Sequence, residues 1–190
     1  MRRHFLWSAA MVGALVLVPP AHAQDGDARV TSAKRATPKP GVVTPRCKID
    51  LGIGQVFVSK AGTSGASGIT INTLIMNHGT GTWKSRPGQQ ILVLALRNES
   101  TGKVTTIREP IPAGPTAGRN VMNYSSPVLH NVFDGFEFGG SIEIRIEYDP
   151  DIRSDAEPCN DDTNASNDHR VIPASRLTPF LLSSRRSGQF

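Results

Sequence analysis

Residues 141–148 read Ser-Ile-Glu-Ile-Arg-Ile-Glu-Tyr, and this stretch decides the fold class. Apolar and polar residues alternate along it, which is the period of a β-strand with one buried face. Ile142, Ile144, Ile146 and Tyr148 are therefore expected to face a core, while the charged residues between them face solvent.

The same alternation recurs on both sides of this stretch. It predicts strands at about 49–53, 69–76, 90–97, 103–107, 119–124 and 169–172, separated by segments rich in glycine, proline and asparagine. The nearly continuous apolar run at 90–97 fits a central strand. About seven short strands, with no convincing helix, predict an all-β fold: an immunoglobulin-like antiparallel β-sandwich over residues 47–172.

The first 23 residues have the pattern of a signal peptide. Arg2 and Arg3 precede an apolar stretch, and Ala21-His22-Ala23 is typical of a cleavage site. The apolar stretch is too short for a stable membrane span, and no later one is longer. We therefore expect a periplasmic or secreted protein. The alternative is a retained signal anchor, and both the general secretory route and the twin-arginine route stay open.

Charge is spread unevenly over the chain. The formal net charge is +5, yet residues 47–172 hold 11 basic and 14 acidic residues, a net charge of −3. The excess of basic residues lies in the signal peptide, in a Pro-rich segment at 24–46 expected to be a disordered linker, and in a flexible basic tail expected at 173–190. A nucleic-acid partner is not expected, because its basic patch would lie on the fold. Loose attraction of the tails to an anionic envelope surface is the alternative to solvated linkers.

The chain has two cysteines, Cys47 and Cys159. An even number in an exported chain favours a disulfide bond between them. Two free thiols or a metal pair are the alternatives, although no histidines stand at zinc-finger spacing.

An acidic segment follows residue 148 and is the densest cluster of charge. Its carboxylates suit calcium, which takes six to eight oxygen ligands, but their spacing is not that of an EF-hand. A solvated loop held by the disulfide is the alternative, so no cofactor is expected other than this calcium. The candidate ligands are Asp149, Asp151, Asp155, Asp161 and Asp162.

Two sets of residues are candidate interaction sites. The segment 103–107 is polar enough for an edge strand, which could pair with a strand of a partner through residues such as Lys103 and Thr105. Trp83 and Tyr124 could form a contact patch, with burial in the core as the alternative.

Catalytic motifs are missing from the sequence. It has no G-x-S-x-G elbow, no phosphate-binding loop, and no histidine pair at metal-binding spacing. The chain is therefore expected not to be an enzyme.

Three features resemble a known family. They are the opening strand Ile49-Asp50-Leu51, the turn at 77–81 (Asn-His-Gly-Thr-Gly), and the strand that ends in Asp149-Pro150-Asp151 before an acidic, Asn-rich loop. Together they resemble the bacterial CARDB-like immunoglobulin-like modules across residues 47–172. This sequence departs from the family in its last loop, which is longer and carries Cys159. The resemblance implies a binding or structural role and supplies no catalytic residues.

These observations predict an exported, non-catalytic binding module that contacts a protein or a glycan in the bacterial envelope. One alternative is a structural accessory or spacer subunit of an envelope assembly. The other is a calcium-dependent or hydrolytic enzyme without a recognised motif.

Overall fold

The computed structural model describes residues 47–62, 68–133 and 139–190. The predicted signal peptide at 1–23 and the predicted linker at 24–46 lie outside these residues.

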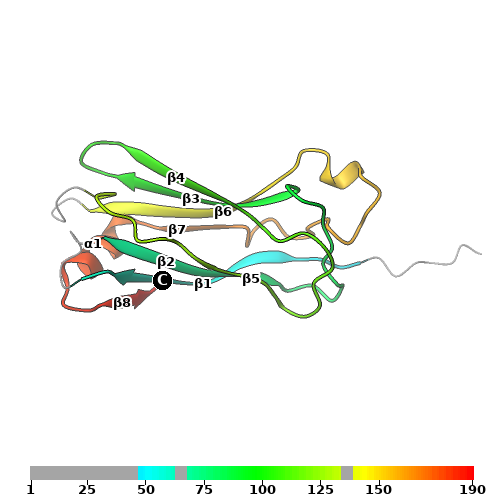
Figure 1. The fold of residues 1–190 in the computed structure, drawn as a ribbon, viewed down its shortest axis with the longest axis horizontal. Helices are drawn as coiled ribbons and strands as arrows, with labels where there is room; N and C mark the ends of the chain where they lie inside the picture. Colours follow the sequence, from blue (N-terminus) through cyan, green and yellow to red (C-terminus); the bar gives the residue numbers. More distant parts are fainter. Residues whose placement is uncertain (1–46, 63–67, 134–138) are drawn as a thin grey trace, which may run out of the picture. The chain divides into compact units, whose positions relative to one another are not determined.

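Two antiparallel sheets of four strands each make up the fold, and they form two layers (Figure 1). One sheet has the order β5-β2-β1-β8 and the other has the order β4-β3-β6-β7. The predicted all-β sandwich is confirmed, with eight strands rather than about seven. The elements are β1 (Leu51–Lys60), β2 (Ile69–Asn77), β3 (Gln90–Asn98), β4 (Val104–Pro110), β5 (Asn120–Ser125), β6 (Gly140–Tyr148), the 3-10 helix η2 (Ile152–Ser154), β7 (His169–Ile172), the helix α1 (Ala174–Leu182) and β8 (Ser187–Gln189).

The core lies between the sheets and follows the alternation in the sequence. On β6, Ile142, Ile144 and Ile146 are buried as predicted, and Tyr148 is half-buried. The inward residues of β3 and β2 join the same apolar cluster. Since burying apolar surface is the main favourable term in folding, this shared interior holds the two sheets together.

The predicted disulfide between Cys47 and Cys159 is confirmed, and it joins residues 112 apart in the sequence. Chain-entropy models give such a link a stabilisation of about 4.7 kcal/mol. Nearby, the N–H of Thr163 donates to the carbonyl of Ile49. The long segment between β6 and β7 is therefore attached to the residues just before β1.

The prediction of a flexible tail at 173–190 is wrong. Residues 174–182 form α1, and β8 pairs with β1 in the sheet. Leu177, Phe180 and Leu181 stand at the i, i+3, i+4 spacing of one helix face and are buried in the core. Two prolines mask this helical pattern in the sequence: Pro173 stands at the N-cap of α1, and Pro179 lies inside the helix.

Two further contacts fix this C-terminal segment. Phe190 is buried and meets the Phe180 ring edge-on at 5.5 Å between centroids. The buried Lys60 ammonium donates to the carbonyls of Leu181 and Ser183 at the end of α1, where a cation is favourable. Residues 174–190 therefore belong to the sandwich.

Across the described part of the chain, no helix has both the length and the apolar character needed to span a membrane.

Candidate functional site

A pocket of about 550 Å³ opens where β6 ends and the segment 149–168 begins. This segment, which contains η2, lies at the end of the sandwich opposite α1 (Figure 1). Ile146, Pro150, Ile152 and Ala165 give the pocket apolar walls. Ligand pockets in proteins commonly combine such walls with a few convergent polar groups.

The most unusual polar group in this pocket is the carboxyl of Asp168. Its side chain is 6% exposed, and its Oδ1 accepts a hydrogen bond from the Tyr148 hydroxyl at 3.1 Å. Its Oδ2 accepts no hydrogen bond from any residue within 47–62, 68–133 and 139–190. Asp168 is held in place by its backbone, because its carbonyl accepts the N–H of Ile146 next to the β6–β7 ladder.

Burial, together with the negative charges of Asp162 and Asp50, raises the pKa of Asp168 to about 7. The hydrogen bond from Tyr148 acts in the opposite direction and is too weak to cancel them. Both charges that raise this pKa are negative. Asp168 therefore ionises near neutral pH in a site without a compensating cation among these groups.

Asp162 and Asp50 have a structural function beside this carboxyl. Asp162 accepts the N–H of Leu51 on Oδ1 and the N–H of Asn164 on Oδ2, each at 2.9 Å. Asp50 accepts from the Asn167 side-chain amide at 2.7 Å. These bonds attach the segment before β7 to the start of β1, and burial raises the pKa of Asp162.

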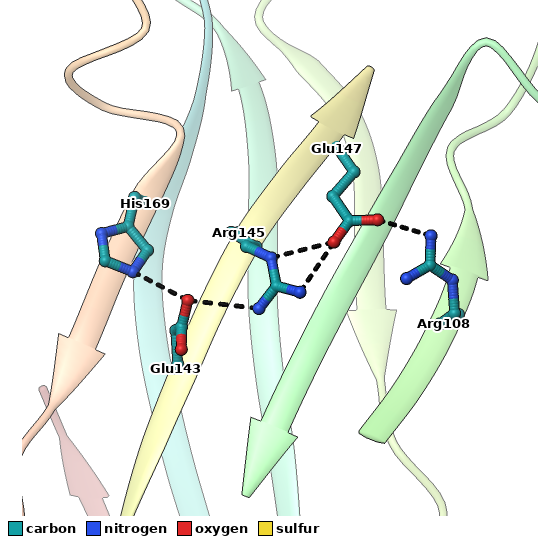
Figure 2. Close-up of polar contacts among 5 residues, drawn as sticks. All are labelled: Arg108, Glu143, Arg145, Glu147 and His169. Carbon is teal, nitrogen blue, oxygen red and sulfur yellow. Dashed lines mark hydrogen bonds and ion pairs between the residues drawn. The ribbon is translucent and has the colours of Figure 1, made fainter. Parts of the chain in front are cut away.

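Two of the cationic groups that line the pocket are already paired. Arg145 forms ion pairs with Glu143 at 3.2 Å and with Glu147 at 2.7 Å, and His169 contacts Glu143 at 3.1 Å. Arg108 on β4 completes this row of alternating charges across the outer face of the sheet (Figure 2). Hydrogen bonds from Arg108 and Arg145 lower the pKa of Glu147.

Arg153 is the remaining arginine of the pocket lining, and it is exposed. Its charge acts on Asp161 and Asp162, whose pKa values it lowers against the effect of burial. Arg145 thus pairs with Glu143 and Glu147, and His169 contacts Glu143. The charge of Arg153 acts on Asp161 and Asp162. Among the described residues, the hydrogen-bond partner of the Asp168 carboxyl is the Tyr148 hydroxyl.

The five predicted calcium ligands are not brought together into one set. Asp149 and Asp151 are exposed, the backbone N–H of Asp151 donates to Asp149 Oδ1, and the neighbouring Asp149 carboxylate raises the pKa of Asp151. Asp155 accepts from the side chains of Gln89 and Asn160, and these bonds lower its pKa. In the part of the chain that the structure describes, no three His, Cys, Asp or Glu side chains are grouped to hold a metal ion. Burial and the charge of Asp155 raise the pKa of Asp161, while Asp162 is hydrogen-bonded to the backbone N–H groups of Leu51 and Asn164. Calcium binding stays a prediction.

The predicted contact patch of Trp83 and Tyr124 is wrong, because Trp83 is 0% and Tyr124 is 6% exposed. Both belong to the apolar core, which is where large aromatic side chains contribute most.

The predicted edge strand is confirmed, since β4 lies at the end of its sheet. The hydrogen bonds at the two ends of the β3–β4 ladder show which backbone groups of β4 face the free edge. The N–H of Asn98 donates to Lys103 and that of Ile111 donates to Gln90, so every second pair between them is hydrogen-bonded. Thr105 therefore bonds to β3. The free backbone groups of the edge belong instead to Val104, Thr106 and Arg108, and the prediction was one residue out of phase.

Sequence reasoning placed Asp168 in the acidic segment but did not select it as a site residue. A signal existed, because Tyr148 ends a strand with its side chain expected to face inward, and Asp168 directly precedes the predicted strand at 169–172. An acidic residue beside an inward tyrosine at a strand end would have indicated a buried carboxyl.

No family model matches the chain, and the searches of curated proteins and of solved structures found no match.

Proposed function

We propose that this chain is an exported, non-catalytic binding domain that contacts a protein or a glycan in the bacterial envelope, using the pocket between β6, β7 and the segment 149–168. The observation that carries this proposal is the Asp168 carboxyl, which is buried in the pocket with one oxygen free of hydrogen bonds from described residues.

A buried carboxylate without a cation destabilises a fold, and such costs concentrate at functional sites. The surrounding groups do not offset this loss of stability, since Asp162 and Asp50 add negative charge. A ligand that donates a hydrogen bond to the free oxygen would offset it. The apolar walls formed by residues such as Ile152 and Pro150 provide the contact area that a bound group needs.

The compartment is supported by two features. The disulfide between Cys47 and Cys159 is typical of an oxidising environment such as the periplasm. The first 23 residues have the signal-peptide pattern described above. The disulfide also anchors one wall of the pocket, so the same bond that suits the compartment shapes the site.

A blocking substitution tests the proposal. Ala165 is exposed and lines the pocket, so Ala165→Trp would fill it, while Ala117→Trp adds the same side chain on an exposed loop elsewhere. The immobilised proteins are incubated with an envelope protein fraction and, separately, with purified cell-wall glycan. We expect the wild type and Ala117→Trp to retain the same material and Ala165→Trp to lose it. Equal retention by Ala165→Trp, or none by the wild type, would refute the proposal.

The free edge of β4 favours a second candidate, a structural accessory that joins an envelope assembly by strand pairing. β4 spans Val104–Pro110, and Val104 is 49% exposed on it. Unpaired backbone groups along an edge are a template for a partner strand. In the same retention assay, this candidate predicts that Thr106→Pro removes binding and that Ala165→Trp does not.

A further inference from the structure

The free oxygen of Asp168 sets the chemistry of what the pocket can hold. Asp168 is more than nine-tenths buried and lines the pocket, with Oδ1 occupied by the Tyr148 hydroxyl. An anion would meet Asp168, Asp162 and Asp149. Of the cationic groups in the lining, Arg145 and His169 are paired with carboxylates of the outer face, and the charge of the exposed Arg153 acts on Asp161 and Asp162.

We propose that the pocket binds a primary ammonium group on an apolar stem, such as the side chain of a lysine, with Asp168 Oδ2 as the carboxylate acceptor. This inference rests on the proposed function, because it names the ligand class of the same pocket.

The hydrogen-bonding geometry favours an ammonium over a guanidinium. A guanidinium binds best to both oxygens of a carboxylate at once, and only one oxygen of Asp168 is free. An ammonium is a compact charge with three rotatable donors. One N–H of the ammonium would donate to Asp168 Oδ2. A second N–H would donate to the Tyr148 hydroxyl oxygen, which can accept a hydrogen bond while its own proton is donated to Asp168 Oδ1.

The same geometry disfavours a calcium ion at this point. Calcium requires six to eight oxygens, whereas both oxygens of Asp162 already accept backbone N–H groups. The alkyl stem of an amine can pack against the apolar walls of the pocket, which a calcium ion would not contact. Ile146 and Ile152 are buried at the pocket, and Pro150 and Ala165 line it as well. Methylene groups gain by leaving water for such walls.

Titration with defined probes tests the inference. The backbone amide resonances of the isotope-labelled full chain are followed during addition of Nα-acetyl-lysine methylamide, of n-butylamine, of the Nε-acetylated lysine compound, and of calcium chloride. Asp168→Asn removes the charge and keeps an oxygen for the Tyr148 hydroxyl. Glu109→Gln on β4 is the control that removes one negative charge away from the pocket.

We expect the two amines to shift the resonances of Tyr148, Ala165 and Asp168, with saturation in the millimolar range, and the acetylated compound to shift none of them. Asp168→Asn weakens the binding by about tenfold or more, because a hydrogen bond to a charged group is lost, and Glu109→Gln does not change it. Tighter binding of the lysine compound than of butylamine identifies a polypeptide as the source. Equal binding identifies a free alkylamine.

Three results overturn the inference: equal binding of the acetylated compound, unchanged binding to Asp168→Asn, or shifts at the pocket with calcium and none with amines. If Ala165→Trp still abolishes retention of envelope material in any of these cases, the proposed function stands and only the ligand class is wrong. If Ala165→Trp has no effect on retention either, both fail.

Discussion

Replacing Asp168 with asparagine should stabilise the ligand-free protein at neutral and alkaline pH. The wild-type carboxyl has a pKa of about 7 in the folded chain, against an ordinary value of 3.8. Asparagine has nearly the same shape and keeps an acceptor for the Tyr148 hydroxyl, which lies 3.1 Å from Asp168 Oδ1. The substitution therefore removes the charge with little change in packing.

The sign follows from where the proton binds. Between pH 3.8 and about 7 the folded chain holds a proton on Asp168 that the unfolded chain has released. The free energy of unfolding contributed by this group consequently falls as pH rises through that window, and it stays low above it. A difference of about three pH units corresponds to about 4 kcal/mol, and we halve this to about 2 kcal/mol because the pocket is open to solvent.

Denaturant unfolding with the disulfide intact measures the effect. Without residues 1–23 the chain has one tryptophan, Trp83, whose buried ring reports unfolding by fluorescence. At pH 8 we expect Asp168→Asn to be about 2 kcal/mol more stable than the wild type, and at pH 4.5 to be within about 0.5 kcal/mol of it. Glu109→Gln should show no comparable growth of the difference with pH. A constant difference across the pH range, or a loss of stability at pH 8, would show that Asp168 is not a strained carboxylate.

Two further predictions concern parts of the fold that the sequence described incompletely. Thr105→Pro should lower the free energy of unfolding by about 2 kcal/mol or more because it removes a hydrogen bond from β4 to β3, whereas Thr106→Pro should lower it by about 1 kcal/mol or less because its N–H faces the free edge. Chemical denaturation compares the two variants, and equal losses would contradict the register. Phe190→Ala should cost about 3 kcal/mol in the same assay because the ring is buried against Phe180, while Leu182→Ala, at a side chain 63% exposed, should change stability by about 0.5 kcal/mol at most; a neutral Phe190→Ala would mean that the C-terminal segment does not support the fold.

The strands could be predicted from the sequence where one face is buried and the other is not. On β6 the alternation of Ile142, Ile144 and Ile146 with charged residues is local information, and the structure follows it. Strand β4 was predicted for the same reason, but its hydrogen-bonding phase was not. Which backbone groups of Thr105 and Thr106 are free depends on the register with β3, and this register is set by contacts far away in the sequence.

The C-terminal helix and the pocket show what a local pattern does not contain. Prolines dominate the local signal at 173–179, yet burial of Leu177 and Phe180 against the sheets outweighs it. The charge of Asp168 is similarly decided by distant partners. Asp50 lies 118 positions earlier in the chain, and only the folded segment brings it close enough to raise the pKa of Asp168.

Strand β6 carries paired charges on its outer face and ends, on its inner face, beside a carboxylate without a cationic partner among the described residues. The outward positions of β6 carry Glu143, Arg145 and Glu147, whose charges are paired with each other and with neighbouring strands (Figure 2). The inward position at its end carries Tyr148, whose hydroxyl donates to Asp168. None of the groups that shift the pKa of Asp168 is a cation that would offset its negative charge. Exposed ion pairs contribute little to stability, so the outer row is easily exchanged for other residues. The inner carboxylate, by contrast, lowers stability at neutral pH, and a bound cation would reverse that loss. If the pocket holds an ammonium group, ligand binding and the stability of the β6–β7 end of the sandwich are therefore coupled, and the gain in stability on binding should disappear in Asp168→Asn.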